Sequence, residues 1–348
     1  MKNFAEFFSE EAIIRELARE RLKRADRRGK RLFYRRIAPL PERLLDDRHE
    51  GDMLFPPRRL WGRFRPRDRR GKSAQALNLI ALTRATSCLR GEMPHAAWAA
   101  QLSSTVTELR SRALGVASFE FAAPCIIPCE KDPGKNRFRP LAQFRLKDKI
   151  IEVLTARYLR HALDGALLAS CLAFRVGEKG IQPPSIHSAL NSIMAMNRRH
   201  RKRGLWVAEC DIRAFFDCVG HDVAQRSLHG LIADRRRQTK DLHVDNRALE
   251  IFTAYLAAYS FSDNVLSAAP CLLRGRPKGA EFPWPAEDLR KLGYGNDLSR
   301  IGVPQGGAIS CLIANAVLHA ADKRLNRLDQ PHRHFRYMRY CDDMIVLA

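Results

Sequence analysis

Long apolar runs, closely spaced cysteine pairs and acidic side chains are all scarce in this sequence. No stretch reaches the roughly 18 consecutive apolar residues that a transmembrane helix needs, so we predict no membrane span. The opening residues, MKNFAEFFSEEAIIREL, carry acids within their apolar stretch, and we therefore expect no signal peptide. That stretch predicts an amphipathic helix instead. Its apolar face would carry Phe4, Phe7, Phe8, Ile13, Ile14 and Leu17.

The nine cysteines are scattered, and no CxxC pair occurs. Cys125 and Cys129 are the closest pair, while Cys210 and Cys218 flank an acidic segment without a histidine at zinc-finger spacing. This pattern is typical of reduced thiols in a cytoplasmic protein, and a structural zinc site is the alternative.

Acidic residues are too few to balance the basic ones. Lys and Arg total 61 against 38 Asp and Glu, which gives a net charge of +23. Such a chain repels itself unless a polyanion neutralises it, so the charge favours nucleic acid as a partner over an anionic membrane surface.

The basic residues concentrate in the first 70 positions. One block runs over residues 19–31 and another from Arg58 to Arg70. We expect the basic side chains to hold phosphates and the aromatic ones to stack on bases, the alternative being a solvated helix followed by a packed loop. The interleaved aromatic residues are Phe33, Tyr34, Phe55, Trp61 and Phe64.

Hydrophobic periodicity divides the chain into expected elements. Helices are predicted over 72–115 with a break at Gly91–Pro94, over 146–163, 185–200 and 221–262, and from Ala308 onward. Extended segments are predicted over 120–143, 205–211, 334–340 and 344–347. Residues 270–302 are predicted to form a long loop or inserted hairpin.

Three carboxylates lie at the ends of predicted strands. Asp211 ends the strand Trp206–Asp211, and Asp342 and Asp343 lie at the tip of a predicted β-hairpin. Adjacent acids between two apolar strands repel each other unless a cation is present. Mg²⁺ prefers such hard oxygen ligands, and two ions about 4 Å apart stabilise the attacking and leaving oxygens of nucleotidyl transfer.

These residues belong to an ordered set of motifs that resembles bacterial reverse transcriptases. Tyr340-Cys341-Asp342-Asp343 resembles the YxDD box of that family, and Asp211 followed by Phe216 resembles its first palm motif. Three further matches are Arg137–Leu141 with the basic fingers motif, Ala173–Gly177 with the FRxG segment, and Gly302–Ser310 with the PQGG block. The five motifs occur in the family's order.

The resemblance implies roles for individual residues. Asp211 and Asp342, with the Ile212 carbonyl, would bind two Mg²⁺ ions, and Asp343 would support that metal site. Phe216 would lie under the sugar of the incoming nucleotide and reject a 2′-hydroxyl, with a core aromatic as the alternative.

The same resemblance assigns the nucleotide-binding residues. Gln305 would contact the nucleotide near its sugar, and Gly306 would let the backbone approach the nucleic acid. Arg139, with Lys131 or Arg137, would hold the triphosphate, and solvated loop charge is the alternative for these three.

As a whole, the resemblance implies an α/β (α+β) right-hand polymerase fold. Residues 1–118 would form a basic helical N-terminal extension, and residues 119–348 the fingers and palm, with an insertion at about 235–300. The chain ends at Ala348, shortly after the YxDD box, so we expect the thumb to be absent and primer extension by these 348 residues to be weak or absent.

The expected activity is RNA-directed DNA polymerisation with an RNA template, a primer and dNTPs. An RNA polymerase is disfavoured by Tyr340 and Phe216, because that class usually carries Gly-Asp-Asp and lacks the aromatic gate. A non-catalytic nucleic-acid-binding remnant and a maturase-like RNA-binding protein are the remaining alternatives.

Overall fold

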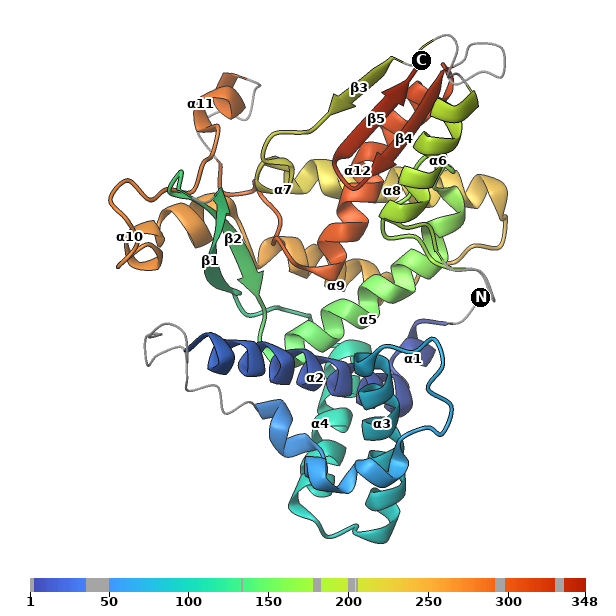
Figure 1. Ribbon diagram of the computed structural model, residues 1–348, viewed down its shortest axis with the longest axis vertical. Coiled ribbons are helices and arrows are strands. Elements are labelled where there is room, and N and C mark those ends of the chain that lie inside the picture. Colours follow the sequence, from blue (N-terminus) through green and yellow to red (C-terminus); the bar gives the residue numbers. More distant parts are fainter. Residues whose placement is uncertain are drawn as a thin grey trace. The chain divides into compact units, whose positions relative to one another are not determined.

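The computed structural model describes residues 3–35, 50–132, 134–177, 183–199, 204, 206–291, 298–328 and 335–348. The chain divides into two compact units, which Figure 1 draws in sequence colours. One unit, here unit 2, holds the residues up to Ser118 together with Leu146–Leu154. The other, unit 1, holds Phe119–Arg145 and Thr155–Ala348. Both α-helices and antiparallel sheets are present, so the fold is of mixed α and β structure.

Unit 2 is helical in its described part. Its helices are α1 (Phe4–Phe7), α2 (Glu10–Arg35), α3 (Ala74–Glu92) and α4 (Ala97–Leu114), with short 3-10 turns between Glu50 and Phe64. The predicted amphipathic helix at the N-terminus is therefore two helices. Asn3 and Glu6 form a reciprocal capping box on α1, and the Ser9 hydroxyl accepts from the Ala12 N–H, so a second helix starts there.

Two aromatic residues of the basic segment, Phe55 and Trp61, pack inside unit 2, whereas Phe64 is only partly buried. Phe55 and Trp61 are buried, and the Arg21 guanidinium lies 5.5 Å and 4.6 Å from their ring centroids. Trp61 Nε1 also donates to the Pro56 carbonyl at 2.8 Å. The expectation that these two rings stack on bases is therefore wrong, because both rings are already covered by protein. The side chains of Arg27, Arg28, Lys30, Arg31, Phe33 and Tyr34 lie outside the described residues.

Two antiparallel sheets organise unit 1. A hairpin pairs β1 (Cys125–Asp132) with β2 (Arg137–Gln143). A second sheet has the order β3-β5-β4, from β3 (Val207–Cys210), β5 (Asp343–Leu347) and β4 (Arg336–Tyr340). Leu205 and His334, which were expected to begin two of these strands, lie outside the described residues.

Helices complete unit 1. The longest are α5 (Leu146–Leu163, whose first half groups with unit 2), α8 (His221–Gln238), α9 (Asn246–Ala257) and α12 (Ala308–Asn326). The helix α6 (Ile186–Arg199) lies near β4, and α7 (Phe215–Cys218) follows β3. Figure 1 shows α12 running beside the β3-β5-β4 sheet. The apolar spacing that predicted α12 is confirmed, since Ile309, Leu312 and Ile313 are all buried.

The segment between α9 and α12 attaches to the β1–β2 hairpin. It contains a π-helical turn (Ser262–Leu266) and the short helices α10 (Ala269–Leu272) and α11 (Ala286–Leu289). Phe138 N–H donates to the Glu281 carbonyl at 2.9 Å, and Glu281 N–H donates to the Asn136 carbonyl at 3.0 Å. Phe282 is buried against Ile126 and Phe138. At Glu281 this segment thus bridges to the edge of β2, whereas the sequence predicted a long loop or inserted hairpin over 270–302.

Among the helices that the structure describes, none combines the length and apolar character required to cross a bilayer.

Candidate active site

The first carboxylate, Asp211, follows β3 at the point where the chain turns into α7. Ala214 has a φ of 53°, in the left-handed region, and its carbonyl accepts from the Asp217 N–H. This turn reverses the chain within a few residues. As a result, Asp211 and Phe216 both line one cavity although they belong to different elements.

The other two carboxylates lie at the turn between β4 and β5. Tyr340 pairs with Asp343 across the hairpin, and Cys341 has a φ of 62°. The strand β5 also pairs with β3, with Cys210 opposite Met344. Since the next residue along β3 is Asp211 and the preceding one along β5 is Asp343, the register brings all three carboxylates to the same end of the sheet.

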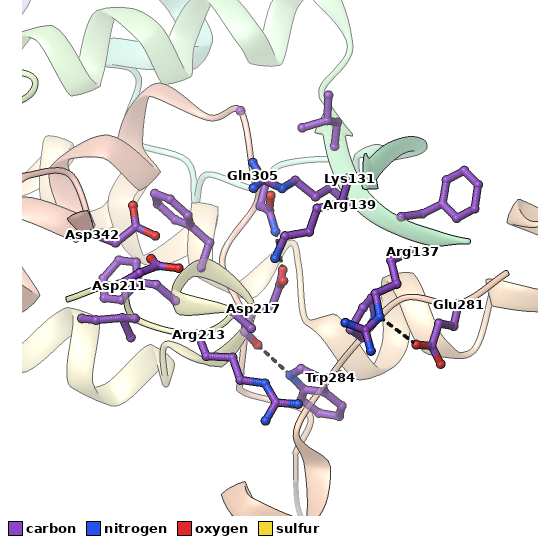
Figure 2. Close-up of a pocket in the computed structure, with 18 of the residues that line it drawn as sticks. Lys131, Arg137, Arg139, Asp211, Arg213, Asp217, Glu281, Trp284, Gln305 and Asp342 are labelled. Carbon is purple, nitrogen blue, oxygen red and sulfur yellow. Dashed lines mark hydrogen bonds and ion pairs between the residues drawn. The ribbon is translucent and has the colours of Figure 1, made fainter. Parts of the chain in front are cut away.

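A cavity of about 780 Å³ opens at this end of the sheet. Figure 2 shows Asp211 and Asp342 close together, with Lys131, Arg139 and Gln305 pointing into the same space. All ten residues that the sequence assigned to the site line it. These are Lys131, Arg137, Arg139, Asp211, Ile212, Phe216, Gln305, Gly306, Asp342 and Asp343.

The acidic side of the cavity is suited to a cation. Partial burial raises the pKa of Asp343, and the neighbouring charges of Asp342, Asp211 and Glu209 raise it further. Like charges this close disfavour one another's ionisation, and a divalent cation would relieve that repulsion. The oxygen donors of Asp211, Asp342 and the Ile212 carbonyl fit Mg²⁺ by their chemistry. Within the described ranges, no cluster of three or more His, Cys, Asp or Glu side chains with the geometry to hold a metal ion was found.

The basic side of the cavity comes from the β1–β2 hairpin. Arg137, Arg139 and Leu141 alternate with the buried Phe138 and Pro140 along β2, because successive side chains of a strand point to opposite faces. Lys131 on β1 also lines the cavity. The sequence left open which arginine serves the site, and both arginines line the cavity with different neighbours. Arg137 Nε lies 3.5 Å from Glu281 Oε1, whereas the positive charges of Arg139 and Lys131 act on Asp217 and lower the pKa of its carboxyl group.

Gln305 joins the two sides of the cavity. Its backbone carbonyl accepts from the Ala142 N–H of β2 at 3.0 Å, and its side-chain Nε2 donates to Asp217 Oδ1 at 2.7 Å. Gly306 follows with a φ of 93°, a conformation that a residue with a side chain rarely adopts. The backbone here therefore runs close to β2 and leaves the amide of Gln305 held in the cavity wall.

Asp217 is a site residue that the motif comparison did not single out. It is 7% exposed, and burial raises its pKa from the ordinary 3.8 to about 6, against the opposing effects of the Gln305 hydrogen bond and the charges of Lys131 and Arg139. The sequence did contain a signal, because an acid directly after two phenylalanines in a short helix needs a polar partner. Gln305 is that partner.

Trp284 is a second residue that the sequence did not reveal. Its ring stacks on Phe261 with centroids 4.9 Å apart, and its Nε1 donates to the backbone carbonyl of Asp217 at 2.9 Å (Figure 2). With Glu281 and Pro283 it forms part of the cavity wall. No local pattern indicated this, because the contact joins residues 67 positions apart.

The two adjacent phenylalanines of α7 have different environments. Phe215 is buried, while Phe216 is only partly buried, with ring centroids 5.2 Å apart. Both line the cavity. Phe216 is therefore the ring with surface left for a ligand, and Phe215 serves as packing.

The remaining motif, Ala173–Gly177, does not line the cavity. Arg175 instead makes a paired contact with Asp164, with Nε 2.9 Å from Oδ1 and Nη2 3.2 Å from Oδ2, and donates to the Cys171 carbonyl. Through these contacts Arg175 holds the loop of this motif in place. All nine cysteines are free thiols in the structure.

A scan against protein-family models and a search of curated proteins found no match to this chain.

Proposed function

We propose that this protein is an RNA-directed DNA polymerase that joins dNTPs to a primer by two-metal nucleotidyl transfer, with the fingers and palm of a right-hand polymerase in unit 1. The observation that carries the proposal is one cavity with carboxylates on one side and cations on the other. A bound nucleoside triphosphate needs carboxylates to hold its metal ions and cations to hold its phosphates, and both must lie within the length of one nucleotide.

The carboxylates of Asp211 and Asp342, with the Ile212 carbonyl, would hold Mg²⁺, and Asp343 would contribute negative charge beside them. Bound Mg²⁺ stabilises the attacking and leaving oxygens of the displacement. These ligands lie at the ends of paired strands, and a rigid support of this kind keeps the ions at a fixed spacing.

Lys131 and Arg139 would bind the triphosphate. Both cations line the cavity, and their charges act on the nearby Asp217 carboxyl group, so phosphate oxygens bound there would meet positive charge. Arg137 is paired with Glu281 and would contribute less. Charge-assisted contacts to phosphate are among the stronger polar interactions of a protein.

Phe216 and Gln305 would define the position of the sugar. The partly buried ring of Phe216 supplies a flat surface, and a 2′-hydroxyl placed against it would clash. Gln305 is held by its hydrogen bond to Asp217, which fixes the orientation of the amide. Together these residues favour deoxynucleotides, which separates this proposal from an RNA polymerase.

A non-catalytic nucleic-acid-binding protein is the second candidate. The exposed arginines of the segment Arg58–Lys72 and the net charge of +23 favour it as much as they favour a polymerase. It gives no reason for three carboxylates to converge at one end of a sheet, where they repel each other. A maturase-like role is compatible with either activity.

Single-nucleotide addition is the test of the proposal. A labelled DNA primer on an RNA template is mixed with an excess of the protein, one complementary dNTP and Mg²⁺, so that processive synthesis is not required. We expect the wild type to add one nucleotide and Asp211→Ala and Asp342→Ala to add none, because no other residue can replace either ligand.

The matched control is Asp288→Ala, an exposed acid of the same unit that does not line the cavity. It should add the nucleotide as the wild type does, and circular dichroism should show that all variants are folded. Addition by Asp211→Ala at the wild-type rate, or none by the wild type under these conditions, would contradict the proposal.

A further inference from the structure

Arg339 is a charged side chain in the interior of unit 1. It belongs to β4, is 1% exposed, and lies two residues before the Cys341 that begins the carboxylate-bearing turn. Removing a guanidinium from water is costly, so a chain with 61 basic residues would keep this one buried only where it makes several strong contacts.

Its main partner is Asp322 of α12. Arg339 Nε donates to Asp322 Oδ1 at 2.8 Å and Nη2 donates to Oδ2 at 2.6 Å, a two-bond arrangement that fixes the plane of the guanidinium. The Tyr337 hydroxyl also donates to Asp322 Oδ1, at 2.8 Å. Both charged side chains are fully buried.

A second set of contacts connects Arg339 to the loop before Phe174. The backbone N–H of Arg339 donates to the Ser170 carbonyl, and its carbonyl accepts from the Leu172 N–H. Nη2 reaches the Cys171 thiol of this loop at 3.2 Å, and Nη1 reaches Oδ1 of Asn315, a residue of α12, at 3.2 Å. The side chain is therefore held from α12 and from this loop at once.

One donor of the guanidinium points at the turn itself. Arg339 Nη1 donates to the Cys341 carbonyl at 2.7 Å. Cys341 has a φ of 62°, a left-handed conformation that is strained for a residue with a side chain and persists only when its surroundings enforce it. The carbonyl that Arg339 holds belongs to the peptide leading directly into Asp342.

We propose that Arg339 is a positioning residue, whose direct hydrogen bond fixes the Cys341 carbonyl and so aims the Asp342 carboxylate at the metal. This inference rests on the proposed function. Buried ion pairs add little net stability compared with apolar residues of similar volume. Precise support of a metal ligand, in contrast, is worth a factor of about 10–100 in affinity.

The experiment separates stability from metal affinity with two variants. The triple variant Asp322→Leu/Tyr337→Phe/Arg339→Met removes the whole charged cluster without leaving a buried charge or an unpaired hydroxyl. We expect it to fold with a thermal midpoint close to that of the wild type and to bind Mn²⁺ about 10- to 100-fold more weakly. Asp322→Asn, by contrast, keeps the Arg339 bond to Cys341 and should lose stability while its Mn²⁺ affinity stays near that of the wild type.

Mn²⁺ binding is measured by the electron paramagnetic resonance of free Mn²⁺ during titration. The matched control is Arg112→Met/Asp148→Leu, which removes another arginine–aspartate pair, with a 2.7 Å contact, from unit 2. It should leave Mn²⁺ binding unchanged. If affinity follows the thermal midpoint across the variants, or if the triple variant binds as the wild type does, Arg339 is only structural and the inference fails. If the wild type shows no binding that Asp211→Ala abolishes, the proposed function fails with it.

Discussion

At the scale of single residues, two left-handed backbone positions shape the candidate site. Ala214 turns the chain from β3 into α7, and Cys341 forms the tip of the β4–β5 hairpin. Neither is a glycine, so each is held by neighbouring contacts: the Asp217 N–H on the Ala214 carbonyl, and the Arg339 guanidinium on the Cys341 carbonyl. Such conformations are concentrated at functional sites, where the surrounding structure enforces them.

The first residue-scale prediction concerns Phe216. Phe216→Val shortens the ring that would meet a 2′-hydroxyl, and we expect ribonucleotide incorporation relative to deoxynucleotide to rise roughly 10-fold or more. Primer–template affinity should not change, because the substitution removes no charge. The measurement is the ratio of kcat/KM for rCTP and dCTP in single-nucleotide addition.

Phe215→Leu is the matched control for this prediction. Phe215 is the buried neighbour, so the control should lower stability without altering the choice of sugar. An unchanged ratio in Phe216→Val would reduce Phe216 to a packing residue.

At the scale of elements, the segment Arg58–Lys72 of unit 2 combines buried aromatic and exposed basic side chains. Trp61 is buried with Arg21 against it, whereas Arg65, Arg67 and Arg69 are exposed. The exposed arginines are available for phosphate contacts and the tryptophan is not available for stacking. Binding of this segment to nucleic acid would therefore depend mainly on charge, since Phe64 is the aromatic residue of the segment that keeps exposed surface.

The element-scale prediction follows from that division. Replacing Arg65, Arg67 and Arg69 with Gln should lower RNA affinity and flatten its salt dependence. Each cation removed from the phosphates of a single strand reduces the slope of log K against log [salt] by about 0.7, so the three substitutions together reduce it by about 2. Fluorescence anisotropy with a labelled RNA at several salt concentrations measures the slope.

The control variant carries three glutamines at exposed arginines of unit 1. This control has the same net charge as the variant with Gln at positions 65, 67 and 69. If the binding surface lies on unit 2, the control should change the slope of log K against log [salt] less than that variant does. Equal slopes for the wild type and both variants would show that the segment does not bind RNA. The control positions are Arg226, Arg236 and Arg274.

At the scale of the whole molecule, the site has a cost in stability. Asp217 is buried with a pKa of about 6, raised from 3.8 chiefly by burial, so the folded protein holds this proton more tightly than the unfolded chain does. Between those two values the folded state binds more protons, and its free energy of unfolding therefore falls as pH rises. At about 1.4 kcal/mol per pH unit, the loss contributed by Asp217 is roughly 3 kcal/mol once the pH exceeds about 6.

We therefore predict that Asp217→Asn is more stable than the wild type at neutral pH and gains little below about pH 4. The amide oxygen of Asn can still accept the hydrogen bond from Gln305, and it never ionises. Urea unfolding of both proteins from about pH 4 to about pH 7.5 gives the difference in free energy as a function of pH. Asp288→Asn, at an exposed position, controls for the removal of one carboxylate.

A difference between the Asn variant and the wild type that stays constant over this pH range would contradict the prediction. In that case the Asp217 carboxyl group would titrate alike in the folded and unfolded chains.

The sequence by itself determined most of the elements. Periodicity and turn residues predicted α3 and α4 with the break between them, the β1–β2 region, α5, α12 and the β4–β5 turn, because these depend on local spacing and on which face must be buried. The motifs also predicted the ten candidate site residues, all of which line one cavity. Strand ends that carry acids are visible in a sequence because the polar residues interrupt apolar runs.

Tertiary structure alone decided which side chains meet. Three contacts join residues that are far apart in the chain or on different elements. They are the hydrogen bond of Gln305 to Asp217, that of Trp284 to the Asp217 carbonyl, and the contact of Arg339 with Asp322. The burial of Phe55 and Trp61 against Arg21 likewise depends on where α2 packs. Local patterns fix which face of an element is apolar, but the partner of a buried polar group is set by packing between elements, and no residue spacing records it.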